Sequence, residues 1–265
     1  MIKILFFGDV IGKIGRKAIK EILPELKKEF EPDLVMANIE NLAHGIGATK
    51  KTFEEMREIG LDFFTSGNHI FKKSEIEEVL VDQDSVLIRP ANYPPGVPGQ
   101  GFKMIEVASR KVLIINLIGR VFMREDFDCP FRKIDEILKQ VDTKDLSATI
   151  IDFHAEATSE KAAFGRYVDG RVSAVLGTHT HVQTADNKIL PKGTAFISDI
   201  GMVGAAESII GDKIEPILDS FLTQKPALIE VPEEGEVDIN AVLLEINPKT
   251  KKAVNLTRVD RRIKV

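Results

Sequence analysis

Histidine and amide side chains recur where apolar runs of this chain end. The chain has only five histidines, and His179 and His181 stand two residues apart just after the apolar run VSAVLG. His154 follows SATIIDF, and Asn68 and His69 follow LDFFTSG. Imidazole nitrogens and carbonyl-type oxygens are ligands for metal ions. This arrangement therefore indicates a metal centre.

Two further apolar runs end in carboxylates. Asp9 follows IKILFFG, and Glu40 and Asn41 close the stretch DLVMANIEN. In open α/β sheets the ligand lies outside the carboxyl ends of the strands, so all five strand ends should meet at one place. His44, in the loop HGIGAT, is outside this pattern and is expected to be an ordinary exposed histidine.

Each of these features also has an ordinary structural explanation. An aspartate after a strand commonly caps a helix or forms a turn, and a buried histidine such as His154 commonly hydrogen-bonds within the core. Alternate residues of one strand share a face, so His179 and His181 could bind one ion, but by itself this pair is equally well explained by structure. The coincidence at five successive strand ends favours the metal centre.

The elements that must position these residues alternate along the chain. Apolar runs predict strands at residues 2–10, 33–40, 61–69, 111–119, 147–156, 172–181 and 194–201. Amphipathic spacing predicts helices at 14–30, 49–59, 74–80, 131–141 and 159–167, with Pro24 expected to kink or divide the first. Alternation around Asn-Pro-Lys-Thr predicts an antiparallel hairpin over 237–263. The pattern is that of an α/β protein, and because no linker interrupts it, we expect a single domain over 1–265.

Composition narrows the function classes. The net charge is −5 and the pI near 5.7, which argues against binding nucleic acid through a basic surface but not against a nucleotide substrate. The single cysteine, Cys129, cannot form an internal disulfide and fits a reducing compartment. No run approaches the roughly 18 apolar residues of a membrane span, and the N-terminal run is too short for a signal peptide. We expect a soluble cytoplasmic protein.

The candidate ligands are carboxylates, amide oxygens and imidazoles, without a thiolate. Such a set suits Mn²⁺, Fe or Zn²⁺. It contains more ligands than one ion uses, which points to two ions sharing a bridging carboxylate. A pair of ions of this kind holds a phosphate and activates a water, as in metal-dependent phosphoesterases.

The order GD, N-x-E-N, GNH, a strand-end histidine and GTHTH resembles the calcineurin-like metallophosphoesterases, specifically the YmdB-like branch. The resemblance extends over nearly the whole chain and includes DFHAEATSEKAAFGRYVDGRVSAVLGTHTHVQTAD and ISDIGMVG. The superfamily's usual D-x-H is absent, because Val10 and Ile11 follow Asp9, and Glu40 stands where a bridging aspartate is usual. Both departures are features of the YmdB-like branch, and Asn41 could replace the missing histidine.

This resemblance implies a four-layer αββα sandwich with a dinuclear centre of Fe or Mn, with Zn as a further option. It implies that the first ion is held by Asp9, Glu40, Asn41 and His181. It implies that Glu40 bridges to a second ion, which is completed by Asn68, His154 and His179. The catalytic residue implied is His69, which would stabilise the phosphate or protonate the leaving oxygen.

The activity implied is a phosphodiesterase that hydrolyses 2′,3′-cyclic nucleotides by attack of a metal-bridging hydroxide on phosphorus. Two alternatives stay open: a phosphomonoesterase acting on nucleotides, and a regulatory or scaffolding protein of RNA metabolism that keeps the metal site and binds an RNA-processing partner. We also expect a homo-oligomer without membrane attachment.

Several nearby residues have two interpretations. Gly12 and Gly15, in GDVIGKIGR, could offer backbone N–H groups to a phosphate or serve only the turn. Glu156, Lys161 and Asp199 lie in the family-like stretches and could orient the histidines. For Glu156 and Lys161, surface ion pairs are an equal alternative.

Overall fold

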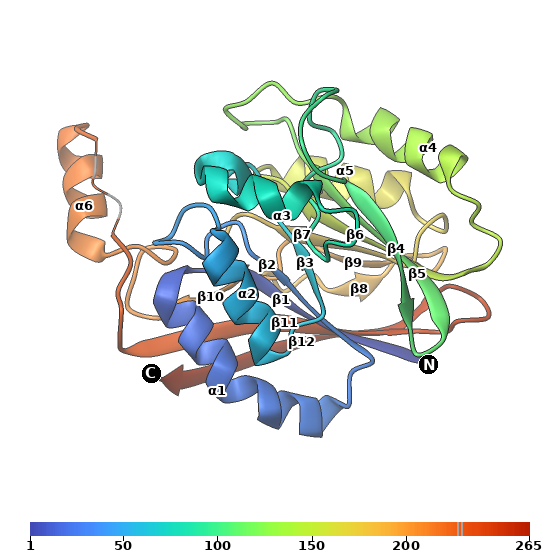
Figure 1. The fold of residues 1–265 in the computed structure, drawn as a ribbon, viewed down its shortest axis with the longest axis horizontal. Helices are drawn as coiled ribbons and strands as arrows, with labels where there is room; N and C mark the ends of the chain where they lie inside the picture. Colours follow the sequence, from blue (N-terminus) through green and yellow to red (C-terminus); the bar gives the residue numbers. More distant parts are fainter. Residues whose placement is uncertain (227, 229) are drawn as a thin grey trace.

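The computed structural model describes residues 1–226, 228 and 230–265 and shows two sheets packed face to face, with helices on both outer faces (Figure 1). This is the four-layer αββα sandwich that was expected. Within the described residues, no helix combines the length and the apolar character that crossing a membrane requires.

The first sheet has the order β12-β11-β10-β1-β2-β3. Strands β1, β2, β3 and β10 are parallel, whereas β11 runs antiparallel to β1 and β10 and pairs with β12 as the predicted hairpin. The strands are β1 (Ile2–Val10), β2 (Leu34–Asn38), β3 (Phe63–Thr65), β10 (Met202–Ala205), β11 (Glu236–Ile246) and β12 (Ala253–Lys264).

The second sheet has the order β4-β5-β6-β7-β9-β8. Its central strands β5, β6, β7 and β9 are parallel, with β4 and β8 antiparallel at the two edges. The strands are β4 (Phe102–Val107), β5 (Arg110–Ile118), β6 (Leu146–His154), β7 (Ala174–Thr178), β8 (Lys188–Ile189) and β9 (Ala195–Ile197). The short strands β4, β8 and β10 were not predicted from the sequence.

The helices cover the outer faces of the sheets. The α-helices are α1 (Gly12–Phe30), α2 (Lys50–Ile59), α3 (Glu77–Val81), α4 (Pro130–Gln140), α5 (Thr158–Tyr167) and α6 (Ile214–Thr223), and the 3-10 helices are η1 (Ile70–Lys72) and η2 (Ser74–Ile76). Helices α1 and α2 lie on the first sheet, and α4 and α5 on the second (Figure 1). Helix α6, which the sequence did not predict, projects away from the body (Figure 1).

Three apolar layers hold the sandwich together. The middle layer lies between the sheets and contains Ile4 and Phe6 of β1, Ile150 of β6 and Leu176 of β7, all fully buried. Because successive residues of a strand face opposite sides, Leu5 and Phe7 of β1 enter the layer beneath α1 instead. Both faces of β1 are thus buried, as its uninterrupted apolar run predicted.

Pro24 does not divide the first helix, since α1 continues from Gly12 to Phe30. Proline cannot donate a hydrogen bond to the carbonyl one turn earlier. Here Lys20 and Pro24 both lie on the exposed face, where water can bind that free carbonyl group. The helix therefore accommodates the proline.

Candidate metal centre

All eight predicted site residues meet at the carboxyl ends of strands from both sheets. Asp9 lies in β1, and Glu40 and Asn41 lie in the turn after β2. Asn68 and His69 follow β3. The second sheet contributes the last residue of β6 and two residues beyond β7, which are His154, His179 and His181.

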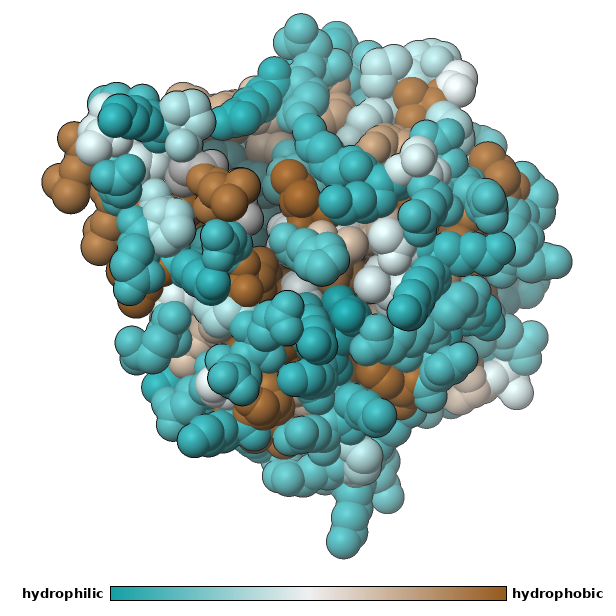
Figure 2. Space-filling model, turned by 60° about the vertical axis from the view of Figure 1, so that its left-hand side comes forward, coloured by the Kyte–Doolittle hydropathy of each residue, from teal (hydrophilic) through white to brown (hydrophobic). Residues whose placement is uncertain are grey.

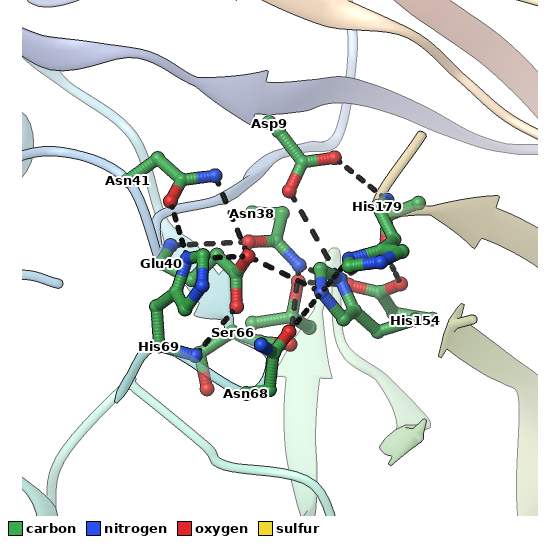
Figure 3. Close-up of polar contacts among 12 residues, drawn as sticks. Asp9, Asn38, Glu40, Asn41, Ser66, Asn68, His69, His154 and His179 are labelled. Atoms are coloured by element: carbon green, nitrogen blue, oxygen red, sulfur yellow. Dashed lines mark hydrogen bonds and ion pairs between the residues drawn. The ribbon is translucent and has the colours of Figure 1, made fainter. Parts of the chain in front are cut away.

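One group of side chains gathers around His154. Its Nε2 lies 3.2 Å from Glu40 Oε1, 3.2 Å from Asn68 Oδ1 and 3.0 Å from His179 Nδ1 (Figure 3). The ligand atoms of Glu40, His154 and His179 all lie within 4.8 Å of one another. His154 is fully buried, and Glu40 is 1% exposed. This spacing and burial suit a metal ion.

A second group gathers around Asn41. Its Nδ2 lies 3.2 Å from His181 Nε2 and 3.4 Å from Glu40 Oε1. The Glu40 carboxylate therefore contacts members of both groups. This is the position expected of a bridging ligand.

His179 and His181 do not lie on alternate positions of a strand, because β7 ends at Thr178. Both have left-handed backbone conformations, with φ of 100° and 64°, which are uncommon for residues with a side chain. Their side chains reach different groups: His179 contacts His154, and His181 contacts Asn41. A strained loop therefore aims them at the site, and the shared strand face inferred from the sequence is wrong.

Asp9 is fully buried beside both groups. Its Oδ2 accepts a 3.0 Å hydrogen bond from the backbone N–H of His179, whereas Oδ1 has no hydrogen-bond partner among the residues that the structure describes. Burial is the main cause that raises the pKa of Asp9 to about 7. A buried carboxylate oxygen of this kind is stabilised by a cation, so Asp9 fits a metal ligand.

The electrostatics of the cluster favour positive charge. Burial by itself would lower the pKa of His154, but the charge of Glu40 and the contact with it, together with the charges of Asp9 and Asp152, raise that pKa to about 9. Burial would raise the pKa of Glu40, and the surrounding histidines, His154 foremost, outweigh it and hold that pKa well below its usual range. The carboxylates therefore favour a positive charge on His154 or on a metal ion beside it.

Gly67 leaves the centre of the cluster free. A Cβ atom at this position would lie 2.2 Å from Glu40 Oε2 and 2.3 Å from His154 Nε2. Both distances are far below van der Waals contact, so any larger residue would occupy the space between these two ligands. The glycine of the GNH motif is thus part of the site.

Asp152, fully buried, was missed as a site residue although it lies in the quoted stretch DFHAE. Its Oδ1 accepts a 2.7 Å hydrogen bond from the Thr178 hydroxyl, and Thr178 Oγ1 lies 2.9 Å from His154 Nδ1. Because the hydroxyl proton goes to Asp152, Thr178 accepts the Nδ1 proton of His154, so Nε2 is the nitrogen that can give up its proton to bind a metal ion. Asp152 stands two residues before His154 on the same strand, and this i, i+2 spacing was the available sequence signal.

The structure decides between the interpretations given above for Lys161, Asp199 and Glu156. Lys161 and Asp199 are buried, and Lys161 Nζ donates to Asp199 Oδ2 at 2.7 Å and to the carbonyl of Thr178 at 2.8 Å. This pair is internal and supports the histidine loop, so the surface alternative for Lys161 is wrong. The Glu156 side chain is 48% exposed, and its Oε2 lies 3.1 Å from His179 Nε2, where it can fix the ring's orientation.

The glycine-rich loop after β1 has a structural role. The backbone N–H of Gly12 donates to the carbonyl of Asn41 at 2.9 Å, and a Cβ atom on Gly15 would lie 2.4 Å from the carbonyl oxygen of Val203. The first N–H is therefore engaged, and the second glycine is needed for close packing. His44 is exposed, as expected.

His69 lies at the edge of the cluster and faces a pocket. Its Nδ1 lies 3.0 Å from Asn41 Oδ1, and its backbone N–H donates to Glu40 Oε2 at 3.0 Å. Burial is the main cause that lowers the pKa of His69. The pocket has a volume of ≈ 480 Å³ and is lined by Glu40, Asn41, Asn68, His69, His179 and His181, and also by Lys72 and residues 122–125. Figure 2, in which the left-hand side of Figure 1 comes forward, shows a hollow in the surface beside the projecting lobe at the upper left.

The profile of the YmdB-like protein family matches residues 5–259 of the chain. The chain is 46% identical to the 2′,3′-cyclic-nucleotide 2′-phosphodiesterase of Bacillus subtilis, over 97% of this chain and 96% of that protein. It resembles the solved structure of a novel phosphatase from Mycoplasma pneumoniae, with a TM-score of 0.91 and 37% identity over 99% of this chain and 93% of that one. A hypothetical protein from Thermus thermophilus has the same TM-score at 38% identity, over 98% and 99% of the two chains.

Proposed function

The chain belongs to the YmdB-like protein family, and from this membership and the polar cluster we propose that it is a metal-dependent phosphodiesterase that hydrolyses 2′,3′-cyclic nucleotides. The observation that carries the proposal is the convergence of Glu40, His154 and His179 within 4.8 Å, at the base of a pocket of nucleotide size. The activity named for the Bacillus subtilis relative, 46% identical over nearly the whole chain, supports the same conclusion.

The residues fit two transition-metal ions, Fe or Mn foremost and Zn as a further option. Asp9, Asn41 and His181 would hold one ion; Asn68, His154 and His179 would hold the other, with Glu40 shared between them. Asp9 Oδ1, which accepts no hydrogen bond from the described residues, and the space above Gly67 support this fit. When bound, such ions lower the pKa of a bound water and neutralise charge on a phosphate.

The protein's own side chains supply the rest of the chemistry. His69 lines the pocket beside Asn68 and would protonate the leaving oxygen or stabilise the phosphate. Thr178 and Asp152 keep the Nε2 electron pair of His154 directed at the cluster. Lys72 lines the same pocket and adds positive charge near a bound phosphate.

The proposal is tested with purified protein reconstituted with Mn²⁺ or Fe²⁺. Elemental analysis should find close to two ions per chain. Hydrolysis of 2′,3′-cyclic AMP should exceed hydrolysis of adenosine 3′-monophosphate at equal metal content. Faster hydrolysis of the monoester would identify a phosphomonoesterase, an alternative that the name of the Mycoplasma pneumoniae relative also supports.

Replacing Glu40 by glutamine should remove nearly all activity while the chain stays folded. Glutamine keeps the length of the side chain but offers one neutral oxygen and an amide that cannot bind a metal. The variant should therefore lose at least one ion, with little change in circular dichroism. Substantial activity in Glu40→Gln with both ions bound would contradict the bridging role.

A further inference from the structure

A tightly anchored loop borders the pocket, and neither the sequence motifs nor the metal ligands explain it. It joins β5 to α4, from Gly119 to Cys129. Asn92, which is fully buried, ties its ends together: its Nδ2 donates to the carbonyls of Ile118 and Asp128 at 2.7 and 2.9 Å. Its Oδ1 also accepts from the backbone N–H of Ile118 at 2.8 Å. The loop is therefore closed at its base by one side chain.

The first residues of the loop are held by Glu160 of α5, which is 7% exposed. Its carboxylate accepts hydrogen bonds of 3.0 Å from the backbone N–H groups of Arg120 and Val121. A Cβ atom on Gly119 would lie 2.6 Å from this carboxylate, so the chain passes directly over it. A buried carboxylate with backbone partners is a strong anchor.

The last residues are held by aromatic packing. The Phe127 ring lies 4.9 Å from the Tyr93 ring in an edge-to-face arrangement, and Tyr93 packs in the same way on Phe71 at 5.4 Å. Such aromatic pairs contribute beyond the area that they bury. Both ends of the loop are thus fixed, and only its middle, residues 122–125, faces the pocket.

Phe122 is the residue that this anchored loop presents. Its side chain is 83% exposed and its φ is 65°. A bulky residue at positive φ is strained, and an exposed phenyl ring forgoes the stabilisation that burial would give. Two unfavourable features coincide in one residue, and that residue lines the pocket that also contains His69 and His179.

We propose that Phe122 is a specificity-determining residue whose ring stacks on the base of the nucleotide. This inference rests on the proposed function, because it places the phosphate at the metal cluster and the base toward the loop. Every nucleobase has a π-face, so an aromatic platform binds nucleotides without selecting one base. Asn92 and Glu160 act as positioning residues for that platform.

The test compares Phe122→Ala with wild type on two cyclic diesters. One is 2′,3′-cyclic AMP, and the other is glycerol 1,2-cyclic phosphate, which has the same five-membered phosphate ring and no base. Loss of one stacking contact should lower kcat/KM for the nucleotide by about 5- to 150-fold, chiefly through KM. The base-free diester should be hydrolysed at the wild-type rate. Phe122→Tyr should keep the wild-type rate on the nucleotide, and Val254→Ala, at a 56% exposed apolar position on β12, should change the rate on neither substrate.

Three results for Phe122→Ala would overturn the inference. These are an equal loss of kcat/KM on both diesters, no loss of kcat/KM on the nucleotide, or a smaller oligomer than wild type, which would assign Phe122 to a contact between copies. If the wild-type protein hydrolyses neither diester, the proposed function fails, and calorimetry still tests the platform. Adenosine 2′-monophosphate should then bind at least 5-fold more weakly to Phe122→Ala than to wild type, and ribose 5-phosphate equally well to both. Equal affinity for the adenosine nucleotide would refute it.

Discussion

Glu40 occupies its position because a short turn follows β2. Asn38 Oδ1 accepts the backbone N–H of Glu40 at 3.1 Å, and Asn38 Nδ2 donates to Asp152 of the second sheet at 3.0 Å. The turn that carries Glu40 is thereby tied to the strand that carries His154. At the scale of single residues, the site is a set of side chains whose neighbours leave them few other orientations.

We propose that His69 acts in the reaction rather than in metal binding. His69→Ala should lower the rate by about 10²- to 10⁴-fold, the usual contribution of a general acid, while the metal content stays near wild type. The loss should shrink for diesters with good leaving groups, which need little protonation. Elemental analysis and turnover on both kinds of diester measure this, and the exposed His44→Ala serves as the control. An equal loss on good and poor leaving groups would assign His69 a positional role instead.

Gly67→Ala tests the space at the centre of the cluster. Because the added methyl group would lie 2.2 Å from Glu40 Oε2, at least one ligand must move away. We expect metal binding and hydrolysis to fall at least tenfold, with a folded chain by circular dichroism. Gly96→Ala is the control: alanine there strains the backbone, because φ is 89°, but its Cβ atom meets no described atom within 4 Å, so metal binding should not change. A Gly67→Ala protein that binds two ions normally would show that the ions lie elsewhere.

At the scale of elements, helix α5 supports the loop that follows β7. Lys161 of α5 donates to the last carbonyl of β7 and to Asp199, and Asp199 Oδ2 accepts the backbone N–H of Thr180 at 3.0 Å. Thr180 stands between His179 and His181. The helix therefore holds the strained conformation of these two histidines through a buried ion pair.

Lys161→Met should destabilise the protein by about 3–5 kcal/mol, because it leaves the Asp199 carboxylate buried without its partner. Lys50→Met is the matched control, since the Lys50–Glu78 pair is more than half exposed on both sides and such pairs contribute at most about 1 kcal/mol. Urea unfolding of both variants measures the difference. Equal effects would mean that the buried pair does not support the loop.

At the scale of the whole molecule, the two sheets depend on each other. Each contributes one face to the middle apolar layer, and the cluster takes ligands from both. We propose that they form one domain, since neither sheet would keep its inner face covered alone.

Helix α6 projects from the sandwich instead of packing against it (Figure 1). Its ten residues are all described, and none of them is buried. Leu218, Phe221 and Leu222 are 49%, 74% and 84% exposed, and their i, i+3, i+4 spacing places them on one face. Figure 2 shows hydrophobic residues on the projecting lobe at the upper left. A helix this short is marginal in water unless it packs against something.

We propose that α6 packs on the α6 of a second copy, because a two-fold pair would bury the same apolar face on both chains. Light scattering coupled to size exclusion should find a homo-oligomer for wild type. The double variant Phe221→Lys with Leu222→Lys should be smaller, and Val254→Lys, at a 56% exposed position on β12, should not. A monomeric wild-type protein would contradict the proposal.

The sequence by itself determined the order of the principal strands and helices and which residues end the strands. Both follow from local patterns, because apolar runs mark buried strands and polar residues mark their ends. The motif order was sufficient to assign the family. Short strands such as β8 and β10 escaped prediction because their patterns are brief or depend on packing.

Only the tertiary structure decided how the histidines reach the site. The positive φ of His179 and His181 occurs in a loop whose Thr180 is held by Asp199. The contacts of Thr178 with Asp152 and His154, and the close approach of Gly67 to Glu40 and His154, likewise join residues that the sequence separates by many positions. The same holds for Phe122, whose exposure depends on Asn92 and Glu160 far away in the chain. Contacts between distant segments arise only when the two sheets pack, so no local pattern contains them.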